Sequence, residues 1–497
     1  MCGKQKTLDS YDERSGTECP NADAVALSMH STQSEEKVIY HDLIESVLDD
    51  ENIETALGRV VGNRGAPGID GMSVFELQGW LHDNIDSLKQ SIREGSYIPT
   101  PVRRKEIPKP NGGVRNLGIP TVRDRLVQQM VAQVLEPIYE PTFSDHSFGF
   151  RPGRSAQDAV LLARSYYEEG FTVMVDLDLE KFFDNLNQDY LMNILRERIK
   201  DQALITLVKR FLRAGVALPN GLIEATPKGS PQGGPLSPLL SNIYLDRFDR
   251  LLESRGLRFC RYADDCAIFV RSQRAGERVR DSCTRYLEGT LRLKVNMEKT
   301  KVGSPADLQF LGFNIAPSRV GTAIMVPSPE KVARFRRTVR RITKRNRGVS
   351  PKTVISELNA YIRGWFGYYG LTDDRRLIVR LDKWVRRRVR QFILKKWKRF
   401  QTIVGNLRGL CPRKVRVMFE DQGRSDAWLH GCKHAASAKG WWDMSRRPTV
   451  QQAMNNQWLR EQGMYFMLDD WENVRERCFN RHVPNGMHGG VRGRLAD

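Results

Sequence analysis

Two adjacent carboxylates in the middle of the chain have the types and spacing of metal ligands. Asp264 and Asp265 stand between two short runs of apolar and β-branched residues, within RFCRYADDCAIFV, residues 258–270. Such a pattern predicts a strand, a two-residue turn and a second strand, with both acids at the tip of the hairpin. Two like charges this close repel each other unless a cation lies between them. The stretch therefore fits either a metal site or an ordinary surface hairpin with acids at its turn.

A second group of carboxylates favours the metal site. The stretch FTVMVDLDLEKFFDNL, residues 171–186, begins with the alternation typical of a strand and then carries Asp176, Asp178 and Asp184. An acid at the end of one strand beside an acid pair on a hairpin suits two-metal phosphoryl transfer, in which ions roughly 3.5–4 Å apart clamp the attacking and leaving oxygens. Mg²⁺ prefers a few carboxylates together with phosphate and water oxygens. We therefore expect two Mg²⁺ ions at these acids.

The two acidic stretches resemble the catalytic motifs of reverse transcriptases. Y-A-D-D, preceded by Arg261, looks like their active-site hairpin, and DLEKFFDNL looks like their first catalytic motif. The match is closest to group II intron-encoded proteins, the reverse transcriptase–maturases of bacteria and organelles. The resemblance implies an RNA-directed DNA polymerase in which Asp178, Asp264 and Asp265 are catalytic and bind the metal ions. Leu179, next to Asp178, is also expected among the metal-binding positions.

Two basic residues are expected to bind the phosphates of the incoming nucleotide. In YIPTPVRRKEIPKPNGGVRNLGIP, residues 97–120, an Asn-Gly-Gly turn separates two short strands and places Lys109 and Arg115 on opposite arms of a hairpin. The resemblance implies that both residues contact the triphosphate, where Arg can grip a phosphate bidentately and Lys acts as a point charge. Solvated charges on an exposed hairpin are the alternative interpretation.

Two other residues are implied to contact the rest of the nucleotide. Gln232 stands in a Gly/Pro-rich loop that leads into a helix, ATPKGSPQGGPLSPLLSNIYLDRFD, and the matching Gln of the family touches the nucleotide. Phe183, five residues after Asp178, has the position of the aromatic ring that blocks a ribose 2′-hydroxyl. Because Phe182 is adjacent, the alternative is that Phe183 is one more core aromatic.

The formal net charge of +20 is the strongest compositional signal and favours a polyanionic partner such as nucleic acid. Residues 331–400 hold 23 Lys and Arg but only 4 Asp and Glu, a net charge of +19, whereas residues 1–50 carry a net charge of −7. A charge run is usually a solvated face, but so one-sided a segment would repel itself unless a polyanion meets it. We therefore expect residues 331–400 to bind RNA.

A motif within this basic segment resembles the maturase-specific domain of group II intron proteins. The pattern L-N-x-Y-I-R-G-W-x-x-Y-Y lies within a predicted helix over residues 355–370, and another helix is expected over residues 381–399. The resemblance implies that this domain binds intron RNA and also serves as the polymerase thumb. Earlier in the chain, SFGFRPGRSA is close to the pattern of the same intron proteins. The residues expected to contact RNA are Arg151, Arg154, Arg363, Arg387 and Arg390.

The order of these segments predicts an α+β protein built as a right-hand polymerase. Fingers and a palm with an RRM-like sheet are expected to precede an α-helical thumb and a small helical C-terminal region, which is thought to help bind DNA in similar proteins. A helix is expected over His41–Val61, and the Gly-rich stretch 62–71 either links two helices or lies against template RNA. The expected divisions are a disordered acidic tail (1–40), fingers and palm (41–320), thumb and maturase domain (321–405) and C-terminal region (406–497).

Composition argues against several other classes of protein. None of the eight cysteines forms a C-x-x-C pair, which fits a reducing cytosol and argues against a disulfide scaffold or an H-N-H-type endonuclease with paired cysteine ligands. The spacing of Cys432, His434, Cys478 and His482 fits no zinc finger. No apolar run approaches the ~18 residues that a membrane span needs. We expect a bacterial cytoplasmic protein that associates with the nucleoid.

The function implied by the resemblance has two parts. The protein would be an RNA-directed DNA polymerase, and it would bind its group II intron RNA to assist splicing and retrotransposition. Its partners would be the intron RNA, an RNA template with a DNA primer, target DNA and deoxynucleotides. Two alternatives stay open: a non-catalytic cofactor that only folds intron RNA, and a domesticated reverse transcriptase in phage defence or repair.

Overall fold

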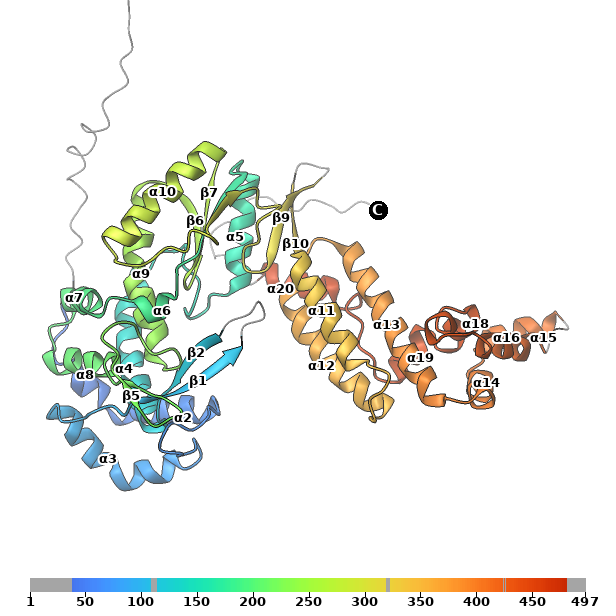
Figure 1. The fold of residues 1–497 in the computed structure, drawn as a ribbon, viewed down its shortest axis with the longest axis horizontal. Coiled ribbons are helices and arrows are strands. Elements are labelled where there is room, and N and C mark those ends of the chain that lie inside the picture. The colour runs from blue at the N-terminus through green and yellow to red at the C-terminus, as the bar shows by residue number, and fades with distance from the viewer. Residues whose placement is uncertain (1–37, 109–113, 319–321, 423, 425, 481–497) are drawn as a thin grey trace, which may run out of the picture.

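The computed structural model describes residues 38–108, 114–318, 322–422, 424 and 426–480. Most of the expected acidic tail, residues 1–37, lies outside the described residues, as does Lys109 with its turn. Figure 1 shows an α/β part that holds all the strands and a helical arm that extends from it. The two parts meet at the short hairpin formed by β9 (Phe313–Pro317) and β10 (Ala323–Pro327).

The N-terminal part combines helices with a four-stranded sheet of order β2-β1-β4-β5. The single helix expected over residues 41–61 is in fact two helices, because Asp49 caps the second one by accepting hydrogen bonds from the main-chain N–H groups of Glu51 and Asn52. Both arms of the hairpin expected within residues 97–120 are present and pair in antiparallel register. The elements are α1 (Leu43–Val47), α2 (Asp50–Gly62), α3 (Leu77–Arg93), β1 (Val102–Pro108), β2 (Val114–Ile119), α4 (Val122–Tyr139), η1 (Glu140–Thr142), β4 (Val216–Ala217) and β5 (Ile223–Glu224).

The central sheet is antiparallel throughout and has the order β6-β7-β3-β8. Numbered by their appearance in the chain, these strands lie in the order 2-3-1-4, which is the β-α-β-β-α-β arrangement expected of an RRM-like sheet. Helices pack on the sheet, and α5 lies between it and the helical arm (Figure 1). The strands are β3 (Val173–Leu177), β6 (Arg258–Tyr262), β7 (Asp265–Val270) and β8 (Lys301–Gly303), and the helices are α5 (Ala156–Glu168), α6 (Phe182–Asn185), α7 (Gln188–Arg198), α8 (Gln202–Leu212), α9 (Leu236–Ser254) and α10 (Gln273–Gly289).

The helical arm begins with three helices, here called the three-helix unit: α11 (Pro329–Ile342), α12 (Pro351–Tyr369) and α13 (Arg375–Trp397). The helices expected over residues 355–370 and 381–399 are therefore confirmed, but both begin earlier. Ser350 caps α12 and Asp374 caps α13, each by accepting a hydrogen bond from a main-chain N–H in the first turn.

The remaining helices run to the far end of the arm and then return. Figure 1 shows α14, α15, α16 and α18 toward the outer end, while α20 lies back beside the three-helix unit. This region is helical, as expected. Its helices are α14 (Phe400–Gly409), α15 (Arg413–Asp421), α16 (Ala427–Ala436), α17 (Trp441–Met444), α18 (Pro448–Ala453), α19 (Asn456–Glu461) and α20 (Trp471–Asn480).

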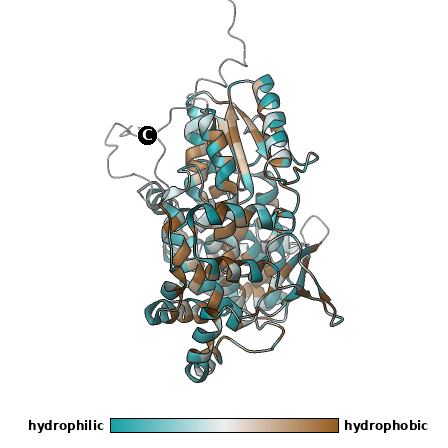
Figure 2. Cartoon of the chain, turned by 90° about the vertical axis from the view of Figure 1, so that its left-hand side faces the viewer, coloured by the Kyte–Doolittle hydropathy of each residue, from teal (hydrophilic) through white to brown (hydrophobic). Residues whose placement is uncertain are grey.

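The central sheet separates two hydrophobic cores. Val175 and Ile268 point into a core shared with the N-terminal helices, whereas Met174 and Phe269 point into a core shared with α5 and the helical arm. Because successive residues of a strand face opposite sides, buried strands with two covered faces read as continuous apolar runs. Figure 2 shows such hydrophobic stretches along the strands and alternating hydrophilic stretches along the surface helices. Among the described helices, none is long and apolar enough to cross a membrane.

Candidate active site

Strand register brings the two acidic stretches together. Tyr262 pairs with Asp265 across the β6–β7 hairpin, so Ala263 and Asp264 form the two-residue turn that the sequence predicts. Strand β3 lies beside β7, with Leu177 opposite Cys266. Continuing this register by one residue places Asp178 opposite Asp265.

A buried arginine holds the turn that carries the acids. Ala263 has a φ of 58°, a left-handed conformation that is uncommon for a residue other than glycine. The Arg261 guanidinium donates to the Ala263 carbonyl over 2.9 Å and forms an ion pair of 2.5 Å with Asp249. The side chains of Arg261 and Asp249 are 1% and 0% exposed. The buried Arg261–Asp249 ion pair, which solvent does not reach, therefore stabilises the strained turn.

The segment before α5 packs directly against the same turn. The Phe148 N–H donates to the Arg261 carbonyl over 2.8 Å, and the Asn242 amide donates to the Gly149 carbonyl over 2.8 Å. A Cβ at Gly149 would lie 2.2 Å from the main-chain nitrogen of Ala263, so only glycine fits this approach. Asn242 in turn accepts a hydrogen bond from Arg261 over 3.1 Å, which closes the network around the turn.

The carboxylates raise one another's pKa. Burial, followed by the charges of Asp265 and Asp178, raises the pKa of Asp176 to about 7. Burial, followed by the charges of Asp264 and Asp178, raises the pKa of Asp265 to about 6, although solvent reaches this side chain through the cavity. Burial also raises the pKa of Asp264. Such mutual repulsion favours a cation between the acids.

The site has carboxylates that suit a divalent metal ion, but their oxygens do not lie close enough together in the structure to bind one ion jointly. Within the described residues, no three Asp, Glu, His or Cys side chains lie close enough together to hold a metal ion. The Lys299 ammonium lies 3.3 Å from Asp178 Oδ2, and Lys299 is 65% exposed, so it is free to turn away. Carboxylate oxygens are the ligands that Mg²⁺ prefers. Leu179 pairs with Val295 in an isolated bridge at the edge of the same site.

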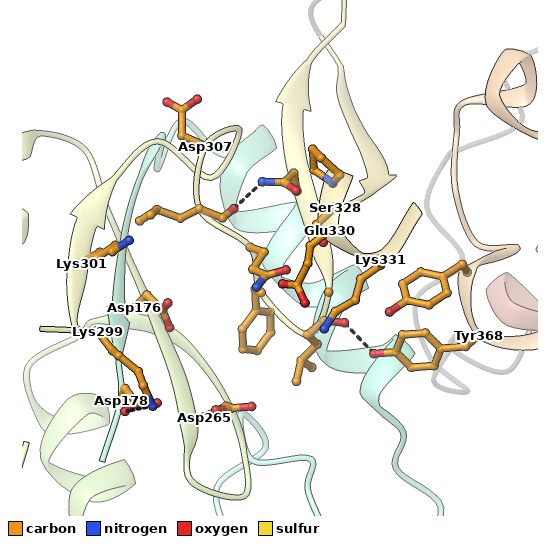
Figure 3. A pocket seen from close by; sticks show the side chains of 18 of the residues that line it. Asp176, Asp178, Asp265, Lys299, Lys301, Asp307, Ser328, Glu330, Lys331 and Tyr368 are labelled. Atoms are coloured by element: carbon orange, nitrogen blue, oxygen red, sulfur yellow. Dashed lines mark hydrogen bonds and ion pairs between the residues drawn. The ribbon is translucent and has the colours of Figure 1, made fainter. Parts of the chain in front are cut away.

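A cavity of about 800 Å³ lies over the acids and is lined from both parts of the molecule. Asp176, Asp178 and Asp265 line it on the side of the central sheet. Lys331, at the start of α11, and Tyr368, near the end of α12, line it on the side of the three-helix unit (Figure 3).

A second cavity of about 400 Å³ brings together three residues expected to bind the nucleotide: Arg115, Phe183 and Gln232. Arg115 Nε donates to Gln232 Oε1 over 3.0 Å. Phe183 is 8% exposed and meets Phe182 edge to face, with ring centroids 5.2 Å apart. Phe183 is thus both a core aromatic and a wall of the cavity.

Phe150 lines the same cavity, and the sequence pattern did not single it out. Its φ is 60°, and the residue is 51% exposed. An exposed aromatic in the left-handed region points to function, because strain of this kind persists only where the surroundings enforce it. The only signal in the sequence is its place inside the SFGFRPGRSA motif.

The Gly-rich stretch 62–71 follows α2 as a loop and borders this second cavity through Asn63 and Gly65. The loop is pinned from outside, because Arg125 donates to the Ala66 carbonyl and Arg103 donates to the Pro67 carbonyl, each over 2.6 Å. It therefore lies where it can form one wall of a nucleotide site.

The placement of Arg151 contradicts its expected contact with template phosphates. Its side chain is 3% exposed, and it pairs with Glu140 over 2.8 Å and donates to the Ser147 carbonyl over 2.9 Å. A buried guanidinium satisfied by the protein has no donor left for a phosphate, so Arg151 shapes the loop before α5. Arg154 remains at the surface, where it pairs with Asp145 over 2.6 Å.

The three RNA-binding candidates of the helical arm also differ in exposure. Arg390 is 8% exposed, and its Nε donates to the Met454 carbonyl over 2.9 Å. Burial lowers the pKa of Arg390 to about 10. Arg390 therefore points inward and anchors the C-terminal helices to α13, which contradicts the expectation that it contacts RNA. Arg387 is half-buried, and Arg363 is exposed and lies over the Tyr465 ring at 4.3 Å.

Two protein families match successive parts of the chain. Residues 107–315 match the family described as reverse transcriptase (RNA-dependent DNA polymerase), and residues 332–408 match the group II intron, maturase-specific domain. The first match covers the central sheet with all its acids, and the second covers the three-helix unit. The chain belongs to the group II intron reverse transcriptase–maturases. Members of this family copy RNA into DNA and act in the splicing and mobility of group II introns, and this chain shares that function.

Relatives of this family support the assignment over most of the chain. The chain is 28% identical over 440 residues to the group II intron-encoded protein LtrA of Lactococcus lactis subsp. cremoris. The matched region covers 69% of this chain and 73% of LtrA. It is 35% identical over 318 residues to protein YkfC of Escherichia coli K12, covering 56% of this chain and 83% of YkfC. It is also 32% identical over 227 residues to the putative COX1/OXI3 intron 2 protein of Saccharomyces cerevisiae, covering 46% of this chain and 26% of that protein. Reverse transcriptase domains use divalent metal ions, which agrees with the acidic site.

Proposed function

We propose that the acids at the end of β3 and at the β6–β7 turn are the catalytic centre of RNA-templated DNA synthesis. The observation that carries this proposal is the register that sets Asp178 beside the turn with Asp264 and Asp265. In this assignment the central sheet is the palm, the β1–β2 hairpin belongs to the fingers and the three-helix unit is the thumb. A primer–template then occupies the cavity between palm and thumb.

Each group near the acids has a role that follows from its position. Asp178, Asp264 and Asp265 would hold two Mg²⁺ ions, with Leu179 beside them, and bound Mg²⁺ stabilises the charge that develops on the attacking and leaving oxygens. Arg115 directs its positive charge at the triphosphate, and the resemblance implies the same role for Lys109, which lies outside the described residues. Gln232 positions Arg115 through their hydrogen bond and faces the same nucleotide. The primer 3′-hydroxyl then loses its proton and attacks the α-phosphate, which forms the new phosphodiester bond, breaks the bond to the β-phosphate and releases pyrophosphate.

Phe183 is proposed to select deoxynucleotides, and replacing it with Val or Ala tests this role. Either change opens space beside the ribose, so we expect discrimination against ribonucleotides to fall while deoxynucleotide use is largely kept. The measurement is the ratio of kcat/KM for matched deoxy- and ribonucleotides. Phe182→Val is the matched control, because Phe182 is 2% exposed and faces the core. Parent-like discrimination in both Phe183 variants would show that the gate lies elsewhere.

Intron RNA is proposed to bind the basic surface of the three-helix unit. This surface is dominated by α11, where cations alternate with the buried Phe335, Val339 and Ile342. The α11 arginines lie on the solvent-facing side of the helix, so contact with RNA would leave these core residues in place. They are Arg334, Arg336, Arg337, Arg340 and Arg341, all exposed.

Two arginines on the other helices of the three-helix unit, Arg363 on α12 and Arg387 on α13, provide a quantitative test of RNA binding by this unit. Changing Arg363 and Arg387 together to Gln should weaken intron RNA binding and flatten its salt dependence. The log–log slope is expected to change by about 0.7–0.9 for each phosphate that the protein no longer neutralises. The measurement is intron RNA affinity over a salt series. Arg278→Gln on α10, an exposed residue far from the arm, is the control, and an unchanged slope in the double variant would remove Arg363 and Arg387 from the RNA interface.

Primer extension on a poly-ribonucleotide template in Mg²⁺ tests the catalytic assignment against the alternative of a non-catalytic splicing cofactor. Synthesis of DNA supports the proposal, and its absence in a folded, RNA-binding protein supports the cofactor. Whether a group II intron surrounds the gene separates an intron-encoded protein from a domesticated one. We further propose target DNA as the partner of the C-terminal helices and the bacterial cytoplasm, at the nucleoid, as the place of action.

A further inference from the structure

The width of the catalytic cavity depends on the angle between the central sheet and the three-helix unit, because each supplies one wall. Besides the β9–β10 hairpin, hydrogen bonds join the two walls near the cavity. The Gln157 amide on α5 donates to the carbonyls of Gly367 and Tyr368 over 3.0 and 3.1 Å. The Tyr368 hydroxyl donates to the Leu311 carbonyl over 2.8 Å.

A single carboxylate, Asp373, joins the same walls farther from the cavity. It lies between α12 and α13 and its side chain is 12% exposed. Asp373 Oδ2 accepts from the Met325 N–H on β10 over 2.9 Å and lies 3.5 Å from Arg164 on α5. Its other oxygen accepts from Arg475 on α20 over 2.8 Å. One largely buried acid therefore gathers cations from α5, which packs on the central sheet, and from the C-terminal helix.

The stretch that leads to α20, residues 463–470, is fixed along the three-helix unit. Asn359 on α12 donates to the Gly463 carbonyl over 2.6 Å and accepts from the Tyr465 N–H over 2.9 Å. Asp382 on α13, which is 2% exposed, accepts from the N–H groups of Met467 and Leu468 over 3.3 and 3.0 Å.

Contacts made by Trp471 and Val474 complete this attachment at the start of α20. The Trp471 ring nitrogen donates to the carbonyl of the fully buried Thr372 over 3.3 Å, and a Cβ at Gly370 would lie 2.6 Å from Val474. Arg475 follows one residue later and lies over the Trp471 ring at 4.7 Å. The packing of α20 therefore holds the Arg475 guanidinium beside Asp373. Forming this contact costs little further conformational entropy, because the helix is already ordered.

We propose that Arg475 is a positioning residue of the polymerase. Through Asp373 it holds the three-helix unit against Arg164 on α5, and so sets the width of the cavity that receives the primer–template. This inference rests on the polymerase site proposed above. It gives the C-terminal region a second role beside the expected binding of DNA. In this role α20, the last of the described helices, stabilises the contact between the three-helix unit and α5, on which retention of the primer–template during synthesis depends.

The test compares full-length variants in primer extension with an excess of unlabelled trap, so that each product reports one binding event. Arg475→Gln should shorten the median product roughly fivefold, the scale of losing one ordinary intramolecular hydrogen bond. The rate of single-nucleotide addition on a pre-bound primer should stay near that of the parent, because the carboxylates are untouched. Arg475→Lys should restore most of the product length. Arg460→Gln is the matched control, since Arg460 pairs with Asp469 on the surface, where both side chains are about half exposed.

A double-variant comparison shows whether the effect passes through Asp373. Arg164→Gln should shorten products as Arg475→Gln does, and the combined variant should be little worse than either, because both act on one carboxylate. Parent-like product lengths, an equal loss in Arg460→Gln or a parallel loss of single-nucleotide addition would overturn the proposal. If Arg475→Gln does not fold, Arg164→Gln alone decides by the same product lengths. A parent enzyme that makes no DNA would instead overturn the polymerase site itself.

Discussion

Replacing Asp264 with Ala is expected to lower DNA synthesis by on the order of 10³-fold or more, because bound metal ions supply several kcal/mol of charge stabilisation. Asp264 is one of the two turn residues of the β6–β7 hairpin, beside Asp265 and close to Asp178. Removing its carboxylate takes away a proposed ligand and also lessens the repulsion that raises the pKa of Asp265. The measurement is the rate of single-nucleotide addition at saturating Mg²⁺.

Binding of RNA distinguishes this loss of chemistry from a general failure of the protein. Affinity for intron RNA should stay within a few-fold of the parent, because the cations proposed to bind it lie on the helical arm. Asp281→Ala, which removes an exposed carboxylate on α10, should leave synthesis unchanged. Near-normal synthesis by Asp264→Ala in Mg²⁺ would contradict the assignment of this turn as the catalytic centre.

Replacing Arg261 with Met is expected to cost about 3–5 kcal/mol of folding free energy, because the change leaves Asp249 as an unpaired charge in the core. It also removes the donor that holds the Ala263 carbonyl, so synthesis should fall more than stability alone explains. The measurements are denaturant unfolding and single-nucleotide addition at a temperature where the variant is folded. Arg258→Met is the control on the same strand, because the Arg258–Glu169 pair is about half exposed and such pairs contribute ~0–1 kcal/mol.

The double variant Arg261→Met with Asp249→Leu separates the two effects. Replacing a buried ion pair with apolar residues of similar volume is often close to neutral, so much of the stability should return. The turn would still lack its donor, so synthesis should remain low. Full recovery of both stability and synthesis would show that Arg261 serves only to neutralise Asp249, and a parent-like single variant would contradict both parts of the prediction.

The amino-acid sequence alone determined the elements and the chemistry of the site. The β6–β7 hairpin, its two-residue turn, the strand before Asp178 and the helices of the basic segment all follow from local patterns of apolar residues, turn residues and caps, and the structure contains each of them. These patterns extend over only a few neighbouring residues, so they can be recognised in the sequence without the structure. The roles of Arg115, Phe183 and Gln232 came instead from the family resemblance, and the structure brings these three residues, far apart in the sequence, to one cavity.

Tertiary structure decided which charges face solvent and which hold the fold together. Arg151 and Arg390 look like RNA ligands in the sequence, yet Arg390 meets a main-chain carbonyl 64 residues later in the chain, and Arg151 meets acceptors 4 to 11 residues earlier, in a loop whose path only the folded structure defines. The division of the helix expected at residues 41–61 has a local cause by contrast, because Asp49 caps the second helix by accepting hydrogen bonds from main-chain N–H groups. Arg475 and Arg164 stand 311 residues apart, and only the return of the chain from the outer end of the arm brings both to Asp373. Burial and long-range pairing depend on the whole path of the chain, so only the folded structure assigns these residues their roles.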